Sequence, residues 1–253
     1  MAEKETMQSV SRVFQLLEYM AENNPLGVRD LHVKTGINTT TVHRMLSTLV
    51  ELGYVHQIAE TGKYTLTYKM AALGNMFVER NDVVNMAHPH LVLLSEKCNE
   101  TVHFVDYMDT KVRYIDKIVP RTGIYSMQSY IGLALPVIKT AAGKAMLAEL
   151  TDDEVRDLWS RSEEITQNND VVPNFTELLE ELKAVRRNEY ALDNEELEAG
   201  IACIGVCITG HDGRAKYGVS VSGPAPRLQG KNIEKISRHL IETKRILTTV
   251  IGH

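Results

Sequence analysis

The clearest hydrophobic pattern in the chain runs from Asn38 to Val55. Apolar residues recur there at three- and four-residue spacing, which predicts a helix with one buried stripe formed by Val42, Met45, Leu46, Leu49 and Leu52. Asn38 and Thr39 stand at its start, where side-chain oxygens can accept from the first backbone N–H groups. Gly53 follows the stripe and can adopt the left-handed conformation that ends a helix.

The face opposite this stripe is polar and carries no acid in its first half. It presents Thr39, Thr40, Thr41, His43 and Arg44, all of which form hydrogen bonds. A helix with such a front half can point its N-terminus into the major groove of DNA and contact base edges. Taken alone, the stretch leaves a solvated amphipathic helix as an equal alternative.

The neighbouring segments decide between these two interpretations. Val28–Thr35 is predicted to be a short helix, and Gly36 follows it where two helices joined by a tight turn need no side chain. Downstream, Tyr54–Gln57 and Lys63–Leu66 are β-prone runs around a Gly-containing turn, which indicates a hairpin. Together with a first helix at Met7–Asn23, these elements predict a winged helix-turn-helix that binds DNA, with Lys63 at the wing.

The rest of the chain mixes strands and helices without a βαβ rhythm. An apolar helix at Tyr68–Glu79 is expected to connect two domains and to dimerise through its apolar face. A further helix spans Val83–Cys98, capped by Asp82 and starting or kinking at Pro89. The remaining predicted strands are Thr101–Met108, Lys111–Ile118, Gly123–Ser129, Cys203–Thr209 and Ala215–Ser222, and the helices are Ala141–Leu150, Asp152–Ser162, Asn174–Asn188 and Lys231–Ile251.

This order predicts an α+β fold with an antiparallel sheet flanked by helices. We expect residues 1–67 to form the DNA-binding domain, 68–81 a linker helix, and 82–253 an effector-binding domain.

Composition constrains how the chain works. It has 253 residues, 43% of them hydrophobic, and no run near the ~18 apolar residues of a membrane span. Three cysteines without paired spacing and no apolar signal-peptide core favour a reduced, cytoplasmic protein. The net charge is −5, yet residues 1–80 hold eight basic and eight acidic side chains. A neutral DNA-binding domain makes few phosphate contacts per copy, which implies binding as a dimer.

Two functions other than DNA binding are alternatives, an enzyme and a ligand-binding module, and a metal site is considered first. His88, His90, Cys98 and His103 do not match a closed zinc pattern, so no metal and no cofactor are expected. An enzyme acting on a small carboxylate would use Cys203 or Cys207 as nucleophile and His211 as base, but no activating neighbour is evident. A ligand-binding module that does not bind DNA is the second alternative.

Small residues open the predicted helix after Thr140. Ala141, Ala142 and Gly143 would let an anion approach the N–H groups of the first turn. Ala145 stands where a Walker A loop needs Ser or Thr, so this is not a nucleotide loop. A close-packed helix start explains the small residues equally well.

The hairpin at 203–222 has two unlike faces. If its turn centres on Asp212 and Gly213, then Cys203 faces Ser222, Gly205 faces Ser220, and Cys207 faces Gly218. All six lie on one side, and the large apolar residues Ile204, Val206, Val219 and Val221 lie on the other. A floor of small residues leaves a cavity unless something large lies above it. We therefore expect a ligand pocket, to which the preceding acidic run at 193–196 contributes one inward acid or remains a solvated loop.

The chain resembles the isocitrate lyase regulator (IclR) family of bacterial transcription factors along nearly its full length. The residues that carry the resemblance are Ser9-Val10 through Leu17-Glu18, Thr41–Leu46, Leu52–Val55, Gly62–Leu66, Glu100–His103, Tyr114–Lys117, Thr140–Ala145, Asp193–Glu196, Ser220–Pro224 and Arg227-Leu228. The resemblance implies a winged helix-turn-helix joined to a GAF-like domain that binds a small carboxylate effector. It also implies a homodimer or dimer of dimers that represses, less often activates, a catabolic operon.

Carried over by position, the effector site of the family falls on Ala141, Ala142, Asp193, Cys203, Ser220 and Ser222. Two segments depart from the family pattern. Asn38–Thr40 replaces a Lys or Pro, and Pro136–Lys139 replaces a Pro-Leu-His or Pro-Leu-Tyr run. Tyr130–Gly132 and Pro120–Gly123 look similar to the sugar-acid branch.

Overall fold

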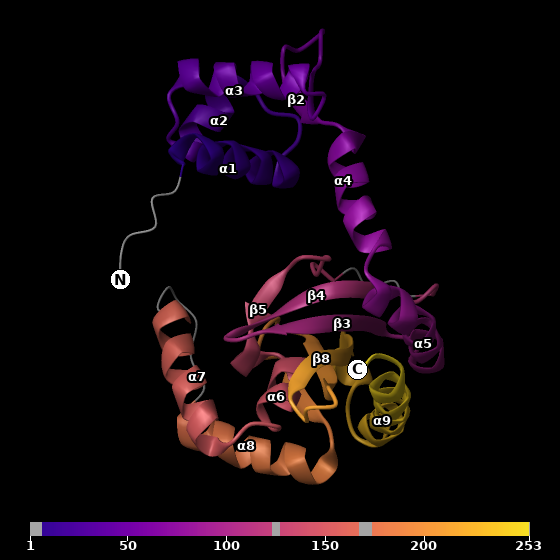
Figure 1. The fold of residues 1–253 in the computed structure, drawn as a ribbon. Coiled ribbons are helices and arrows are strands. Elements are labelled where there is room, and N and C mark those ends of the chain that lie inside the picture. The colour runs from indigo at the N-terminus through magenta and orange to yellow at the C-terminus, as the bar shows by residue number, and fades with distance from the viewer. Residues whose placement is uncertain (1–6, 123–126, 167–173, 253) are drawn as a thin grey trace. The chain divides into compact units, whose positions relative to one another are not determined.

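The chain forms two compact units in the computed structural model, Met1–Asn81 and Asp82–His253 (Figure 1). The structure describes residues 7–122, 127–166 and 174–252. Across these ranges, each helix is too short or too polar to cross a membrane.

The N-terminal unit is a winged helix-turn-helix followed by one more helix, as the sequence predicts. Its elements are α1 (Gln8–Glu22), α2 (Val28–Thr35), α3 (Thr39–Glu51), β1 (Val55–Gln57), β2 (Tyr64–Leu66) and α4 (Tyr68–Glu79). The strands pair antiparallel. The core joins the predicted stripe of α3 to Leu16 and Met20 of α1 and Leu31 of α2. Leu52 departs from that stripe and is 52% exposed, because the helix ends before it.

Helix α4 is fastened to the end of α3. Thr67 Oγ1 donates to the carbonyl of Gly53 at 2.7 Å, and Lys69 Nζ donates to the carbonyl of Leu52 at 2.8 Å. The same ammonium lies 4.7 Å from the centre of the Tyr54 ring. No residue of α4 is buried, and Phe77 is 74% exposed. The helix is thus held at its start while its apolar side chains remain accessible.

The C-terminal unit is an α+β domain built on one antiparallel sheet. Within the described residues the sheet has six strands, in the order β5-β4-β3-β8-β7-β6. These are β3 (Thr101–Met108), β4 (Lys111–Ile118), β5 (Ala134–Pro136), β6 (Ala191–Asn194), β7 (Ile201–Thr209) and β8 (Ala215–Pro224). The helices are α5 (Asp82–Cys98), α6 (Ala141–Leu147), α7 (Asp152–Thr166), α8 (Phe175–Asn188) and α9 (Lys231–Ile251).

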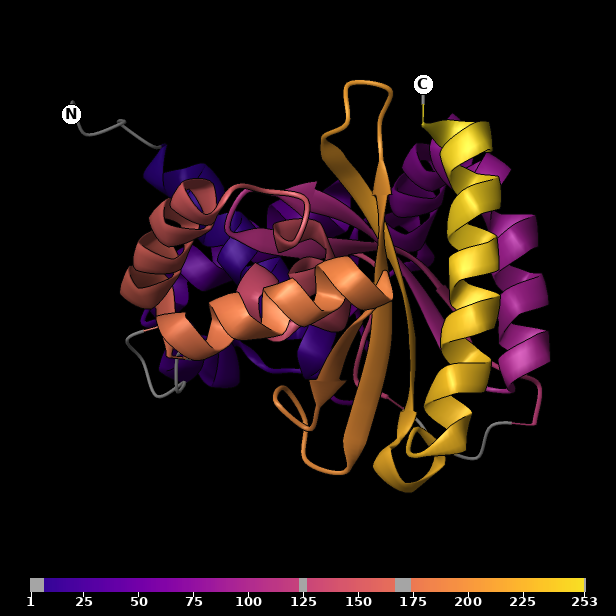
Figure 2. The ribbon, with the colours of Figure 1, turned by 90° about the horizontal axis from the view of Figure 1, so that it is seen from below.

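Helices cover both faces of this sheet (Figure 2). On one face α5 and α9 pack over Ile204, Val206, Val219 and Val221, the large residues of the β7–β8 hairpin. On the other face α6 and α8 pack with Cys207 and Val105 in a second cluster. The predicted division of the hairpin into a large apolar face and a small face is confirmed.

The structure differs from the prediction in several elements. Residues 127–129 are not a strand, residues 123–126 lie outside the described residues, and β5 at Ala134–Pro136 forms the edge instead. Helix α6 ends at Leu147 rather than at Leu150. An unpredicted strand, β6, ends in the first two residues of the acidic run and pairs with β7. Helix α5 continues through Pro89.

Candidate DNA interface and effector site

Helix α3 presents its polar face outward because its stripe is anchored inside. Val42 and Leu46 are fully buried, which turns the opposite face to solvent. Asn38 Oδ1 accepts from the backbone N–H of Thr41 at 2.8 Å and so caps the helix. Thr39, Thr40, His43 and Arg44 are exposed, and Thr41 is half-buried. The structure therefore places the predicted residues together at one helix end.

A groove of about 470 Å³ runs between α3 and α1. Thr41 and Arg44 line it from α3, and Gln8, Ser9 and Arg12 line it from α1. Arg12 is not predictable from local sequence, because only the packing of α1 against α3 brings this residue beside the recognition helix.

The wing is a short turn that holds Lys63 in solvent. Gly62 has φ +66°, and its carbonyl accepts from Gln57 Nε2 at 3.0 Å. The carbonyl of Lys63 accepts from the N–H of Ile58 at 2.8 Å, so the backbone of this residue is fixed. Its side chain is exposed and available to a phosphate.

The four predicted effector residues that belong to strands, Asp193, Cys203, Ser220 and Ser222, lie on one face of the sheet in two neighbouring rows. In the first row Asp193 pairs with Cys203, which pairs with Ser222. In the second row Gly205 pairs with Ser220, which pairs with His103 of β3. The predicted hairpin pairs 203–222, 205–220 and 207–218 are confirmed.

Helix α6 fills part of the small-residue face. A Cβ added at Gly205 would lie 2.4 Å from the backbone of Ala141 and Ala142, and one at Gly218 would lie 3.1 Å from the Ala142 side chain. The expectation of a cavity above the whole small face is therefore wrong at these two glycines, because the close-packed helix start occupies that space. A ligand site at the polar end of this face, near Cys203, Ser220 and Ser222, stays a prediction.

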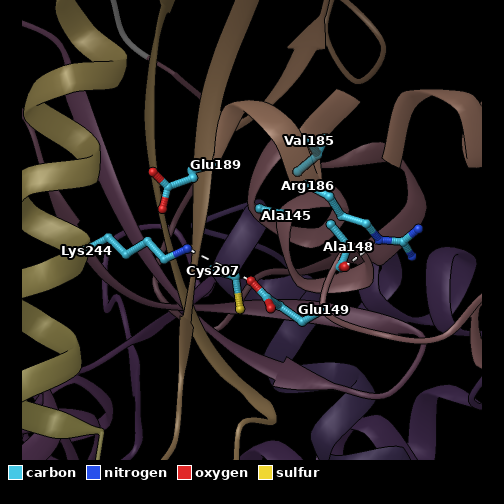
Figure 3. Close-up of a pocket in the computed structure, with 8 residues that line it drawn as sticks. All are labelled: Ala145, Ala148, Glu149, Val185, Arg186, Glu189, Cys207 and Lys244. Carbon is cyan, nitrogen blue, oxygen red and sulfur yellow. Dashed lines mark hydrogen bonds and ion pairs between the residues drawn. The ribbon is translucent and has the colours of Figure 1, made fainter. Parts of the chain in front are cut away.

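Cys207, at the far end of the same face, lines a separate cavity of about 300 Å³ (Figure 3). Lys244 lies 3.9 Å from a Glu149 oxygen across this cavity, and Arg186 Nε donates to the carbonyl of Ala148 at 2.8 Å. Burial raises the pKa of Cys207 to about 12 and that of Cys203 above its ordinary range as well. Both thiols are protonated at neutral pH, which is unsuited to a nucleophile.

Asp193 is a buried carboxyl group, with 2% of its surface exposed. Burial raises its pKa to about 6, although the backbone N–H of Glu196 donates to Oδ1 at 2.9 Å and favours the ionised form. The fully buried Lys144 of α6 forms ion pairs with Glu196 and Glu181, both at 2.6 Å. Lys144 thereby joins α6 to α8 and to the loop that follows Asp193.

Three residues of this face were missed as site residues: His103, Tyr114 and Ser129. His103 Nε2 lies 2.8 Å from Ser129 Oγ, and Nδ1 lies 3.3 Å from Ser222 Oγ. Its ring stacks on Tyr114 with centroids 4.6 Å apart. Burial and the charge of Lys117 lower the pKa of His103 to about 3, so the ring is neutral. The motif Glu100–His103 marks the residue in sequence, but only the β3–β8 register brings it to Ser222.

His88 was considered as a metal ligand. Its Nδ1 instead lies 2.6 Å from Asp116 Oδ2. Over the described ranges, no three His, Cys, Asp or Glu side chains are grouped so that they could hold a metal ion.

Both parts of the chain match family models of known regulators. Residues 9–59 match the IclR helix-turn-helix domain, and residues 75–248 match the bacterial transcriptional regulator IclR C-terminal domain. The chain is 31% identical to the DNA-binding transcriptional repressor YiaJ of Escherichia coli K12, over 97% of this chain and 88% of that protein. It is also 31% identical to the HTH-type transcriptional regulator KdgR of Dickeya chrysanthemi, over 98% of this chain and 81% of that protein.

Among solved structures, IclR of Thermotoga maritima superposes with a TM-score of 0.82 at 29% identity, over 98% of this chain and 100% of that one. These proteins are DNA-binding transcriptional regulators and not enzymes, so the alternative of an enzyme acting on a carboxylate is set aside. The fold, the recognition helix and the matches over almost the whole length lead to one conclusion: the chain belongs to the IclR family of bacterial transcriptional regulators.

Proposed function

We propose that the protein is a ligand-responsive repressor of an operon for the catabolism of a sugar acid or another small carboxylate. The observation that carries the proposal is the pairing, in one chain, of an exposed acid-free recognition face on α3 with a buried polar row on the sheet. The relative YiaJ is a repressor, which supports this sign of regulation over activation. Such a protein acts on DNA in the cytoplasm.

We infer the DNA contacts from the polar side chains that are exposed on α3 and at the wing. Thr39, Thr40, Thr41, His43 and Arg44 would contact base edges or phosphates in the major groove, and Lys63 would contact a phosphate beside the wing.

Substitutions at two basic residues separate these roles. Arg44→Ala removes a base contact, so it should cost about 1–3 kcal/mol and relax one operator position. Lys63→Ala removes only a phosphate contact, so it should weaken all sequences alike and reduce the salt slope by about one. Fluorescence anisotropy with a footprinted operator and its single-base variants measures both. Equal binding of Arg44→Ala and wild type across those variants would refute the assignment.

We further propose that the protein binds DNA as a homodimer or a dimer of dimers on an inverted repeat. Residues 1–80 carry no net charge, so one copy makes few phosphate contacts. The exposed side chains of Leu73, Met76 and Phe77 on α4 offer an apolar surface for a second copy. Footprinting together with sedimentation tests this, and a monomer that protects a single asymmetric half-site would contradict it.

The proposed effector contacts use the polar end of the sheet. The ligand carboxylate would lie at the N–H groups of Ala141 and Ala142, and the hydroxyls of Ser220 and Ser222 would hold its other oxygens. Cys203 would line the wall. Asp193 would accept from a ligand hydroxyl with the lone pairs that the Glu196 N–H leaves free, which favours hydroxylated acids.

Ser222→Val tests this site because it removes the hydroxyl and leaves neither a donor nor an acceptor at this position. Affinity for the effector should fall by about 0.5–1.5 kcal/mol, which is the net value of one hydrogen bond. Operator binding without effector should be unchanged, because the substitution lies in the other unit. The assay is the release of operator DNA by D-gluconate, D-glycerate, lactate and pyruvate. If Ser222→Val and Asp193→Asn both respond like wild type to the acid that acts, the effector binds elsewhere.

A further inference from the structure

A line of five hydrogen-bonding side chains crosses the sheet face at the proposed effector site. It begins at Ser129, passes through His103, Ser222 and Cys203, and ends at Asp193. The two His103 contacts measure 2.8 Å to Ser129 and 3.3 Å to Ser222. Cys203 lies directly opposite Asp193 of β6 and Ser222 of β8 in the sheet, and both side chains are hydrogen-bond partners of its thiol. His103, Ser222 and Asp193 are buried, whereas Ser129 is half-buried and can face a ligand.

The charge on Asp193 fixes the direction of every bond in this line. An ionised carboxylate only accepts, so the Cys203 thiol donates to it and the sulfur accepts from the Ser222 hydroxyl. Ser222 has then used its one proton, so its bond with His103 is donated by Nδ1–H. A neutral imidazole carries one N–H, so Nε2 accepts from the Ser129 hydroxyl. The Ser129 hydroxyl has then used its proton and can only accept a hydrogen bond from a ligand.

When Asp193 is protonated on the oxygen that faces Cys203, that oxygen donates and the line reverses. The thiol proton passes to the carboxylate, the Ser222 proton passes to the sulfur, and the Nδ1 proton passes to Ser222 Oγ. The Ser129 proton passes to Nε2, and one proton from solvent restores the Ser129 hydroxyl. One proton is taken up in total, no net charge is left inside the line, and His103 changes from the Nδ1–H to the Nε2–H tautomer. The new Ser129 proton points away from His103 and is available to a ligand.

We propose that His103 is a positioning residue of the effector site, whose tautomer follows the charge on Asp193 and decides whether Ser129 accepts from a ligand or donates to it. With Asp193 ionised, Ser129 suits a ligand hydroxyl. With Asp193 protonated, Ser129 suits a carboxylate or keto oxygen. A carboxylate held at Ser129 is therefore bound together with one proton. That the ligand is a carboxylate rests on the proposed function, whereas the coupling between His103 and Asp193 does not.

The groups around the two ends are compatible with this switch. Asp193 faces Glu196 from its own loop, Lys144 from α6, Cys203 from β7 and Tyr114 from β4. Its pKa of about 6 means that both of its charge states are populated near neutral pH. His103 faces the ammonium of Lys117, and burial keeps its ring neutral throughout this range.

The coupling is tested without any ligand by nitrogen NMR of the full chain with isotope-labelled histidine. The protein has nine histidines, so His103→Phe identifies the resonances of His103. We expect Nδ1–H at about pH 8 and Nε2–H at about pH 5, with a midpoint near the pKa of Asp193, about 6. Asp193→Asn should remove the pH dependence. Cys203→Ala should interrupt it, and Cys203→Ser, which keeps a donor and an acceptor, should restore it.

Two results would overturn the proposal: a His103 tautomer that stays constant from about pH 5 to 8, or a Cys203→Ala variant that switches like wild type. A His103 ring that becomes cationic in this range would do the same.

The ligand assignment is tested with lactate, pyruvate and D-gluconate, with lactamide as the neutral partner of lactate. For an acid that binds, affinity should fall up to about tenfold per pH unit above pH 6 in wild type, because one proton is bound with it. Affinity should be nearly constant in Asp193→Asn and for lactamide. A flat profile in wild type would refute proton uptake. If none of the acids binds, the effector class of the proposed function is wrong, and the NMR titration still decides the role of His103.

Discussion

At Gly205 the sheet packs closely against the start of α6, and Gly205→Ala perturbs that contact with one methyl group. The new Cβ would lie 2.4 Å from the Ala141 carbonyl carbon and the Ala142 nitrogen, and 2.7 Å from the Ala141 oxygen. All three are backbone atoms, so no side chain can rotate away. Reaching an ordinary contact of 3.4 Å requires α6 and β7 to separate by about 1 Å.

The expected cost is that of overpacking a dense core, about 1–3 kcal/mol. Gly218→Ala is the matched control, because Gly218 lies on the same face of the neighbouring strand. Its added Cβ would meet Met146 Cε at 3.0 Å and two side-chain methyl groups at 3.1 Å. The Met146 side chain can adjust, and the gain from a less flexible unfolded chain offsets part of the cost. We expect Gly218→Ala to change stability by less than about 1 kcal/mol.

Thermal unfolding of the C-terminal unit measures the difference. For a domain of this size, 1 kcal/mol corresponds to a change in Tm of roughly 2–4 °C. Gly205→Ala should lower Tm by about 2–12 °C, and Gly218→Ala by much less. Gly205→Ala should also weaken the effector response, because the displaced residues are those proposed to hold the carboxylate. Equal Tm values for Gly205→Ala and wild type would show that α6 does not rest on the sheet at this point.

Three further predictions concern buried titratable groups. Lys144→Met leaves Glu181 and Glu196 without their cation. Since both carboxylates are about one-third exposed, the free energy of unfolding in urea should fall by about 1–3 kcal/mol, less than for a fully buried pair. Adding Glu181→Gln and Glu196→Gln should recover most of this loss. Asp193 has a pKa raised to about 6, so it binds its proton more tightly in the folded state than in the unfolded state. Its contribution to stability is complete at low pH and is lost as pH rises from about 4 through 6. Between pH 4 and 7, the free energy of unfolding of Asp193→Asn should therefore rise by about 1–3 kcal/mol relative to that of wild type. His103 acts in the opposite direction because its pKa is lowered to about 3: wild type should lose stability through this group as pH falls below about 6.5, and His103→Phe should not.

The sequence was sufficient where structure depends on local pattern. The bounds of α2, α4, β3, β4 and α9 agree with the predicted ones, because caps, turns and hydrophobic spacing lie within a few residues of each other. It was insufficient for β6. The run Asp193–Glu196 has no apolar alternation, so its strand exists only because β7 offers it an edge. The edge strand β5 was missed for the same reason: three residues become a strand by pairing with β4.

The same division applies to the candidate site. The pairing of Cys203 with Ser222 could be predicted, since a hairpin turn fixes the register of its own strands. The approach of His103 and Ser129 could not, because it depends on the register of β3 against β8 and on a segment 26 residues further along the chain. Small residues at Gly205 and Gly218 were compatible with either a cavity or a closely packed helix. Only the position of α6 distinguishes the two.

The construction of α4 limits how a ligand in the C-terminal unit can act on DNA. Its first turn is fixed to the end of the recognition helix through Lys69 and Thr67, so α4 and α3 change orientation together. No side chain of α4 is fully buried within its own chain, and its exposed apolar side chains are stabilised at about 25 cal/mol per Å² only where another surface covers them. In the proposed dimer that surface is a second copy, so the contact between copies, rather than the fold of one copy, determines the spacing of the two recognition helices. Because each N-terminal unit is electrically neutral, operator affinity depends strongly on that spacing. An effector therefore needs only to alter the packing of α4 against its partner, and the base-contacting surface of α3 can remain unchanged.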